Sequence, residues 1–191
     1  MTKMIMEGAG KFTRHYPANV AIVTTRTETD QDAMAAAWHS NISFDPPLLG
    51  VSISPKRHTF KLLVESKKFA MNYVPSERAA IAAQTGGVSG KDANKFEMFG
   101  LQLEEESKLD LPILKDAYAA YECELHSKYT IGDHEWFVGA VLFTHYEEDA
   151  FNVDQMLLTH RVSPTMYLGF DQYLLPPKVA STYLKRGRLP K

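Results

Sequence analysis

The segment 52–60, SISPKRHTF, combines hydroxyl groups and cations where an expected strand gives way to an expected helix. The hydroxyl groups belong to Ser54 and Thr59, and the cations to Lys56 and Arg57. Backbone amides at a helix N-terminus and an arginine side chain are good partners for an anion, so a phosphate group fits this turn. The competing interpretation is an ordinary helix start with surface cations.

A run of small residues precedes this turn. Residues 34–47 read MAAAWHSNISFDPP, and consecutive alanines let a flat ligand approach the backbone closely. Trp38 can stack on such a ligand or form a wall beside it. The competing interpretation is a plain strand that ends in a proline turn.

Two further segments carry groups that can bind a ligand or move a proton. Residues 85–95, TGGVSGKDANK, offer glycine, serine and lysine to a phosphate or to the edge of a polar ring, but they lack the spacing of a nucleotide triphosphate loop. His134 lies beside Asp133 at an expected turn and can give a hydrogen bond or a proton. A surface loop and an exposed histidine are the competing interpretations.

Composition limits the class of protein. The chain has 191 residues, 45% of them hydrophobic, a net charge of −2 and a pI of about 6.4. These values favour one globular domain and do not suit a nucleic-acid-binding protein. The single cysteine, Cys123, cannot form an internal disulfide, which is typical of a cytoplasmic protein. No apolar run is long enough for a membrane helix, and no metal-binding motif is present.

The pattern of apolar residues predicts a β-rich core with short helices. Strands are expected over residues 18–26, 48–54, 68–74, 119–126 and 136–146, and helices over residues 58–66, 76–84 and 93–99. Residues 33–38 suit either a strand or a helix. A break is expected over 44–47, a glycine-rich loop over 85–90, and a hairpin turn over 131–134. Alternation in the strand 119–126 places Ala119, Tyr121, Cys123 and Leu125 in the core and Glu122, Glu124 and His126 in solvent.

In order and spacing, these segments resemble the flavin reductase-like family, whose fold is an FMN-binding split barrel. The resemblance rests on Ser43, DPP at 45–47, VSIS at 51–54, SPKRHT at 54–59, FAMN at 69–72, the glycine loop and GDHEWFVGAV at 132–141. AAW at 36–38, GVSISPKR at 50–57 and AYAAYE at 117–122 are most similar to the branch of flavoredoxins and monooxygenase reductase components.

The resemblance implies a mainly β (α+β) fold, a split β-barrel with short decorating helices. It also implies a single domain over residues 1–191, with a core at about 15–150 and a C-terminal extension over 151–191.

The resemblance also implies site residues. Ala35, Ala36, Ala37 and Trp38 would line the isoalloxazine ring, with His39 and Ser40 beside it. Ser52, Ser54, Arg57, His58 and Thr59 would hold the ribityl chain and phosphate, and Ser89, Gly90 and Lys91 would close over the flavin. His134 would lie near the nicotinamide as the catalytic residue. Family members commonly have threonine where Ala35 stands, so backbone groups must take over that contact with the flavin.

The function implied is that of an NAD(P)H-dependent flavin reductase, a homodimer with one FMN per subunit and with FAD as the alternative cofactor. Electrons would pass to free flavin, ferric iron or a partner protein. Three alternatives remain: an FMN electron carrier without a nicotinamide site, an oxidase of a pyridoxal-type phosphate, and a monooxygenase subunit that delivers flavin by diffusion.

Overall fold

A computed structural model describes residues 2–179 and residue 181, so part of the expected C-terminal extension lies outside the described residues. Seven antiparallel strands form the main sheet in the order β3-β2-β6-β7-β8-β5-β4. Their bounds are Ala21–Arg26 (β2), Gln31–Ala36 (β3), His39–Phe44 (β4), Pro47–Ile53 (β5), Lys68–Tyr73 (β6), Ala119–Ile131 (β7) and His134–Tyr146 (β8).

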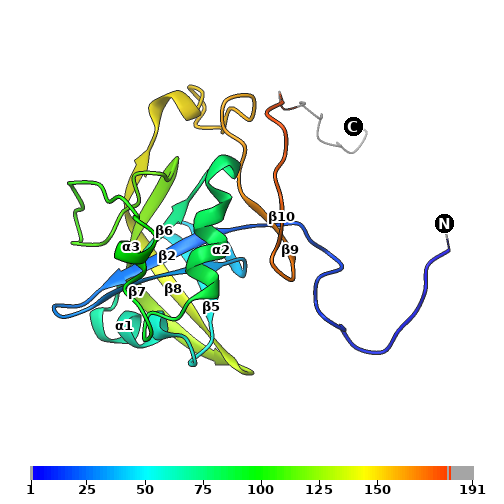
Figure 1. The fold of residues 1–191 in the computed structure, drawn as a ribbon, viewed down its shortest axis with the longest axis horizontal. Coiled ribbons are helices and arrows are strands. Elements are labelled where there is room, and N and C mark those ends of the chain that lie inside the picture. Colours follow the sequence, from blue (N-terminus) through cyan, green and yellow to red (C-terminus); the bar gives the residue numbers. More distant parts are fainter. Residues whose placement is uncertain (1, 180, 182–191) are drawn as a thin grey trace.

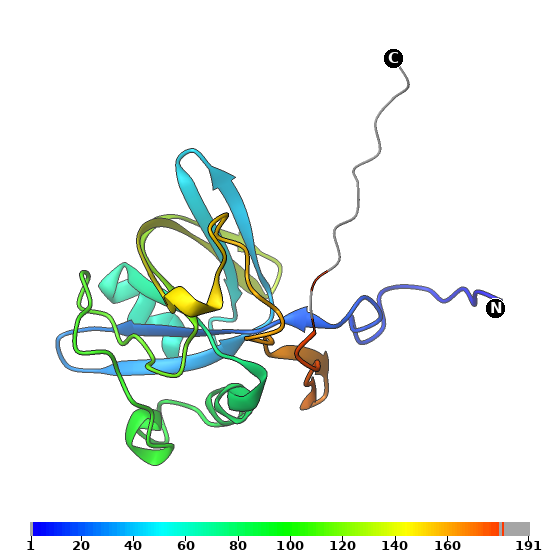
Figure 2. The ribbon, with the colours of Figure 1, turned by 90° about the horizontal axis from the view of Figure 1, so that it is seen from above.

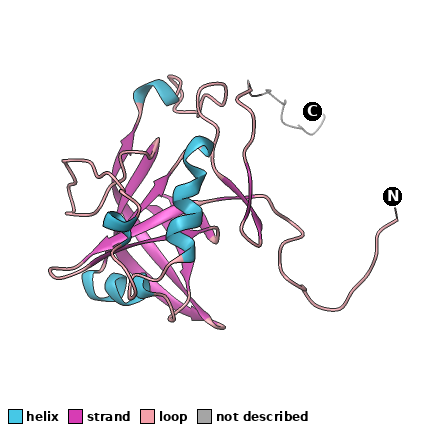
Figure 3. Ribbon diagram, viewed as in Figure 1, coloured by secondary structure: helices cyan, strands magenta, loops and turns pink. Residues whose placement is uncertain are grey.

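The main sheet curls into a barrel that stays open between its two edge strands. β3 and β4 are joined by only Ala37 and Trp38, yet they form opposite edges of the sheet. Ala37 and Trp38 form the corner between β3 and β4. One backbone hydrogen bond, from Ser52 N to Trp38 O (2.9 Å), links β5 to this corner. This confirms the predicted split β-barrel with short helices outside it (Figure 3).

The barrel interior is apolar. Alternate residues of neighbouring strands point inward, and Val23, Val51, Phe69 and Phe137 are all fully buried. Each buried side chain of this size contributes roughly 1.5–3 kcal/mol to folding. The interior is therefore a packed core and not a channel, and a ligand must bind outside it.

Three helices and a small sheet flank the edge strand β3. Helices α1 (His58–Ser66), α2 (Ala79–Gly87) and α3 (Lys95–Met98) each pack against it. The small sheet consists of β1 (Ala18–Asn19), β9 (Met166–Gly169) and β10 (Gln172–Leu174), with β9 in the middle. Figure 1 shows the β9–β10 hairpin crossing the start of the chain, away from the main barrel. The remaining elements are the 3-10 helices η1 (Ser76–Arg78) and η2 (Glu148–Ala150).

The structure corrects one local prediction and decides another that the sequence left open. The glycine-rich loop expected over 85–90 begins only after Gly87, because α2 continues through Thr85, whose hydroxyl donates to Ile81 O (2.8 Å). The ambiguous segment 33–38 is strand as far as Ala36, where pairing with β2 outweighs the helix preference of alanine.

The prediction that Glu122 faces solvent was wrong, because its side chain is fully buried. A register shift between Glu122 and Cys123 breaks the simple alternation of β7. The carboxylate accepts hydrogen bonds from Lys108 N (2.9 Å), Leu109 N (2.6 Å) and Ser107 Oγ (2.9 Å), and it pairs with His145 Nε2 at 2.6 Å. Glu122 therefore anchors the loop 107–109 to the sheet.

Acidification is expected to reduce the stabilising effect of Glu122. Burial raises the pKa of this carboxyl, but hydrogen bonds from His145 and the loop 107–109 bring the pKa below its ordinary value. The carboxylate therefore stabilises the fold above its unfolded pKa, and this contribution is lost as pH falls through the folded pKa. Glu122→Gln should lower the free energy of unfolding by roughly 1.5–3 kcal/mol near neutral pH, and urea titrations should show a smaller difference in acid. An equal difference at both pH values would contradict this role.

Cys123 is expected to be unreactive in the folded protein. Burial, and then the charge of Glu122, raises the pKa of the thiol to about 12, so almost no thiolate exists near neutral pH. A disulfide-exchange reagent should therefore label the protein at the rate of its unfolding, and at once in denaturant. Fast labelling without denaturant would show that the thiol is accessible.

Candidate functional site

A pocket of about 520 Å³ opens beside the split of the barrel. The end of β3 and the corner after it form one wall, with Ala35, Ala36, Ala37 and Trp38. Ser52 and Ser54 approach from β5 and the turn after it, and His134 from the start of β8. Figure 2 shows this side of the molecule, where the N-terminal segment and the β9–β10 hairpin leave the barrel together. The pocket is large enough for a cofactor.

The edge strand β3 offers unpaired backbone groups to this pocket. The Lys95 ammonium donates to Ala33 O (2.6 Å), which shows that this carbonyl points away from β2. In an antiparallel pair every second residue presents its amide and carbonyl in the same direction, so Ala35 also presents them to the open edge. Ala35 lines the pocket, and its backbone can therefore bind the polar edge of a flat ligand.

A smaller pocket of about 110 Å³ continues from the first one at Ala35, Arg57 and Gly86. The start of α1 contributes Arg57, His58 and Thr59, and the loop after α2 contributes Ser89 and Gly90. A Cβ on Gly90 would lie 2.6 Å from both Asp32 Oδ1 and His58 Cδ2, so this position has no room for a side chain. The loop therefore closes tightly over the start of α1.

A buried ion pair forms the floor of the smaller pocket. Lys95 Nζ lies 3.0 Å from Asp32 Oδ1, and the two side chains are 3% and 1% exposed. The Thr59 hydroxyl donates to Asp32 Oδ2 (2.6 Å), and Lys95 also donates to Thr85 O (3.2 Å). These contacts tie β3, α1, α2 and α3 together beneath the site.

His58 pairs with a second acid at the rim. Its Nε2 lies 2.8 Å from Asp30 Oδ2, while its Nδ1 is buried and makes no hydrogen bond within the described structure. Lys56 and Arg57 add positive charge to the same pocket. An anion such as a phosphate suits this set of donors and cations.

At the mouth of the larger pocket, aromatic side chains gather. The rings of Trp38 and His134 lie 5.0 Å apart, and the indole Nε1 donates to the Tyr16 hydroxyl (2.9 Å). His134 Nδ1 lies 2.8 Å from Asp133 Oδ1, and the hydrogen bond from His134 lowers the pKa of Asp133. The second nitrogen, Nε2, is then the one that His134 can turn toward a ligand.

The structure brings most of the predicted site residues together. Eleven of the fourteen predicted cofactor residues line the two pockets: Ala35, Ala36, Ala37, Trp38, Ser52, Ser54, Arg57, His58, Thr59, Ser89 and Gly90. The other three line neither pocket: His39, Ser40 and Lys91. His39 points to the opposite side, where its Nε2 lies 3.2 Å from Asn19 O and burial lowers its pKa.

Other residues of the site were not among the predicted ones. Asp32 and Lys95 form the floor, and Tyr16, Tyr167 and Tyr173 line the larger pocket. The only sequence signal for Asp32 was a charged residue in a β-rich segment. No local pattern links Tyr16 to Tyr167 and Tyr173, because about 150 residues separate Tyr16 from the other two.

A larger groove of about 800 Å³ lies elsewhere, at the far end of β8, where Phe143, His145 and Glu147 line it. None of the predicted site residues contributes to this groove. In the part of the chain that the structure describes, no group of three or more acidic, histidine or cysteine side chains is arranged to hold a metal ion. Among the same residues, no helix has the length and hydrophobicity to cross a membrane.

Comparisons with known proteins give a consistent result. A family model described as a flavin reductase like domain matches residues 13–167. An uncharacterized protein from Pyrococcus abyssi is 36% identical over 136 residues, which are 71% of this chain and 78% of that protein. The family model covers nearly all residues that line the two pockets. The exceptions are Lys11, Gly169, Phe170, Asp171 and Tyr173.

Solved structures share the same fold. An FMN-binding protein from Thermus thermophilus, crystallised with bound 1-cyclohex-2-enone, has a TM-score of 0.80 and 31% identity, and the match covers 96% of this chain and 98% of that one. A flavoredoxin from Methanosarcina acetivorans has a TM-score of 0.81 and 20% identity, with 97% of both chains covered, and supports the fold alone.

Proposed function

The chain belongs to the flavin reductase-like domain family, and on this basis we propose that it is an oxidoreductase that binds FMN and is reduced by NAD(P)H. The observation that carries the proposal is the continuity of the two pockets. The larger pocket has one wall of small residues, Ala35, Ala36 and Ala37, and it leads directly into the small pocket that carries Lys56 and Arg57. FMN has a flat ring system at one end and a phosphate at the other.

The residues present fit FMN. The ring system would lie against Ala35, Ala36 and Ala37, with Trp38 beside it, and the ribityl chain would pass Ser52 and Ser54. The phosphate would be held by Arg57, Ser89 and the amides at the start of α1. The narrow end at Gly90 favours the mononucleotide over FAD, because its lining leaves little room for a second nucleotide. When bound, FMN would supply the redox chemistry, and the protein would supply position and shielding.

The chain's own residues would prepare the site for hydride transfer. Trp38 and Tyr16, joined by their hydrogen bond, would keep water from one side of the ring system. Asp133 accepts a hydrogen bond from Nδ1 of His134, which leaves Nε2 free. In the neutral ring Nε2 would accept a hydrogen bond from the nicotinamide amide, and only the protonated ring would donate a proton to an acceptor. The electron acceptors proposed are free flavin, ferric iron or a protein partner.

A second candidate function is an FMN electron carrier without its own nicotinamide site. The fold shared with a flavoredoxin supports it, because it shows that the same scaffold occurs in a protein of that name. The aromatic mouth formed by Trp38 and His134 favours the reductase, since it leaves ring surface for a nicotinamide to stack on.

We also propose a cytoplasmic homodimer. The single cysteine favours a reducing compartment. On the edge strand β4, the apolar side chains of Ile42 and Phe44 are 44% and 95% exposed, which is unusual at an open sheet edge. Pairing of two copies through this face would cover them. Light scattering of wild type and Phe44→Glu tests it: a wild-type dimer that the charge dissociates supports this face, and a monomeric wild type contradicts it.

The function itself is tested by an absorbance spectrum before and after anaerobic NADH or NADPH. A yellow protein that bleaches supports the reductase. A protein that stays yellow with both nucleotides, but bleaches with dithionite, is the electron carrier. A colourless protein that takes up neither FMN nor FAD overturns both functions.

A further inference from the structure

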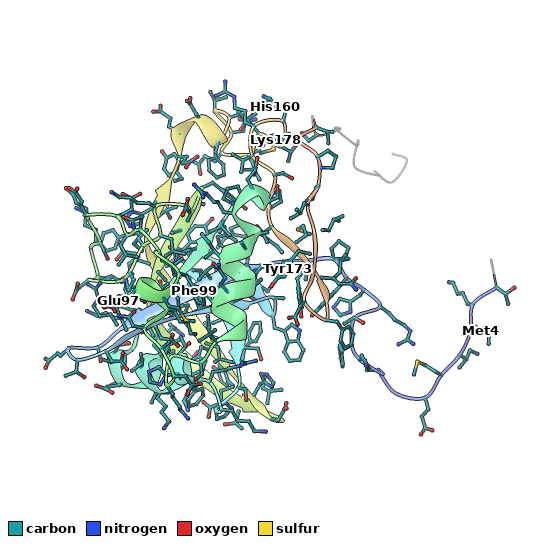
Figure 4. All side chains as sticks on the ribbon, in the orientation of Figure 1. Met4, Glu97, Phe99, His160, Tyr173 and Lys178 are labelled. Carbon is teal, nitrogen blue, oxygen red and sulfur yellow. The ribbon has the colours of Figure 1, made fainter. Side chains whose placement is uncertain are left out.

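The larger pocket has a second wall, and of its residues the proposed FMN site uses only Tyr16, through the hydrogen bond to Trp38. Five side chains form it: Lys11 and Tyr16 from the N-terminal segment, and Tyr167, Phe170 and Tyr173 from the β9–β10 hairpin. β1 pairs with β9, so these two distant parts of the chain lie side by side. Figure 4 shows Tyr173 in the hairpin where it passes α2.

The backbone fixes this wall in place. Gly169 has a φ of +99°, and Phe170 and Asp171 follow with φ of 53° and 59°, so the turn is built from left-handed residues. A Cβ on Gly169 would lie 2.7 Å from Thr13 Cγ2, which means that the hairpin turn touches the N-terminal segment. Such strained turns are retained where the surrounding structure needs them, often at a ligand site.

The wall presents aromatic surface in several directions. The ring centres of Tyr16 and Tyr167 lie 5.9 Å apart, and those of Tyr167 and Tyr173 lie 5.2 Å apart. Both pairs are tilted, and all three rings are only partly buried. Phe170 and Trp38, which are 60% and 45% exposed, line the same pocket. A planar ring between them would cover apolar surface that otherwise meets water.

One cation is available at the same place. Lys11 Nζ lies 4.4 Å above the ring of Phe170. Among the residues that the structure describes, Lys11 has no ion-pair partner, although Asp171 lines the same pocket. The anionic phosphate of FMN is assigned to Arg57 at the other end, so it does not use this charge.

We propose, on the basis of the function above, that this wall binds a planar aromatic electron acceptor with an acidic substituent, such as a quinone sulfonate. The ring lies between Phe170 and Trp38, and the acid group pairs with Lys11. A quinone becomes a hydroquinone by taking up two electrons and two protons. NAD(P)H, the proposed reductant, would supply a hydride, which is two electrons and one proton, and solvent would supply the second proton.

The test measures binding and not turnover. Calorimetry of the oxidised, FMN-loaded protein is carried out with 1,4-naphthoquinone-2-sulfonate and with neutral 1,4-naphthoquinone. Lys11→Met should weaken binding of the sulfonate by roughly two- to fivefold, the size of one exposed charge pair, and leave the neutral quinone unchanged. Gly169→Ala should weaken both probes by separating the hairpin from Thr13. Gly87→Ala, where an added Cβ meets nothing within 4 Å, is the matched control and should change neither.

Three results would overturn the inference: no binding of either probe to wild type, equal weakening of both probes by Lys11→Met, or weakening of NAD⁺ binding alone, which would assign the wall to the nicotinamide nucleotide. In all three cases the protein still retains FMN. Failure to retain FMN would instead overturn the proposed function, so the two failures are distinguishable.

Discussion

Lys95→Met is expected to lower the free energy of unfolding by roughly 3–5 kcal/mol, because it leaves the carboxylate of Asp32 buried without its cation. The Asp32 side chain is 1% exposed, so water cannot replace the ammonium without opening the structure. Ala33 O and Thr85 O lose their donor as well. Urea unfolding of wild type and variant measures the difference.

The double variant Asp32→Asn with Lys95→Met is the control. It removes both charges together, so most of the lost stability should return if the unpaired charge is the cause. The Thr59 hydroxyl can still donate to the asparagine carbonyl oxygen. A double variant no more stable than Lys95→Met would show instead that the contacts of Lys95 with Ala33 and Thr85 dominate. A single variant within about 1 kcal/mol of wild type would show that the pair is not buried as described.

The same substitution should weaken FMN binding. Lys95 links Ala33 O of the edge strand β3 to Thr85 O of α2, and both elements contribute residues to the pocket proposed for the flavin. The double variant restores charge balance but not this link, so its stability should recover while its affinity for FMN stays low. That separation of the two readouts distinguishes a positioning role from a purely structural one.

Most of the fold could be predicted from the sequence where one face of an element meets the core. The pattern of residues 58–66 gave the bounds of α1. The break expected over 44–47 is shorter in the structure, because Phe44 ends β4, a strand that was not predicted, and Pro47 begins β5. Prediction failed where a contact distant in sequence decided the outcome. Glu122 follows the solvent pattern of its strand, but a register shift and the donors of the loop 107–109 allow it to be buried.

The candidate site could also be predicted where neighbouring residues act as a group, and not where a contact distant in sequence decides. The residues contiguous in sequence, from Ala35 to Trp38 and from Arg57 to Thr59, line the pockets because a strand end and a helix start place them as groups. His39 does not, because the corner after Trp38 begins a strand on the opposite edge of the sheet and turns its side chain toward Asn19. Lys91, which was predicted to close over the flavin, lines neither pocket. Lys95, at the start of α3, was not predicted, and it supplies the buried cation beside Asp32.

Gly90→Ala is expected to reduce the affinity for FMN by roughly tenfold to hundredfold and to leave riboflavin almost unaffected. The added methyl group would lie 2.6 Å from Asp32 Oδ1 and His58 Cδ2, neither of which is a free chain end, so the loop that carries Ser89 must move away from the start of α1. The phosphate then loses part of its hydrogen bonds, whereas riboflavin has no phosphate to lose. Fluorescence titration of the apoprotein with both flavins measures the two affinities.

Gly87→Ala serves as the control for this variant too, because it adds the same methyl group three residues earlier into open space. If Gly90→Ala weakened FMN and riboflavin equally, the loop would be closing over the ring system and the phosphate would lie elsewhere. If it weakened neither, the small pocket would not take part in flavin binding at all. A selective loss for FMN would place the phosphate between the loop 88–90 and α1. It would also explain why this position carries glycine although its backbone conformation does not require one, since the glycine leaves the space in which the loop closes.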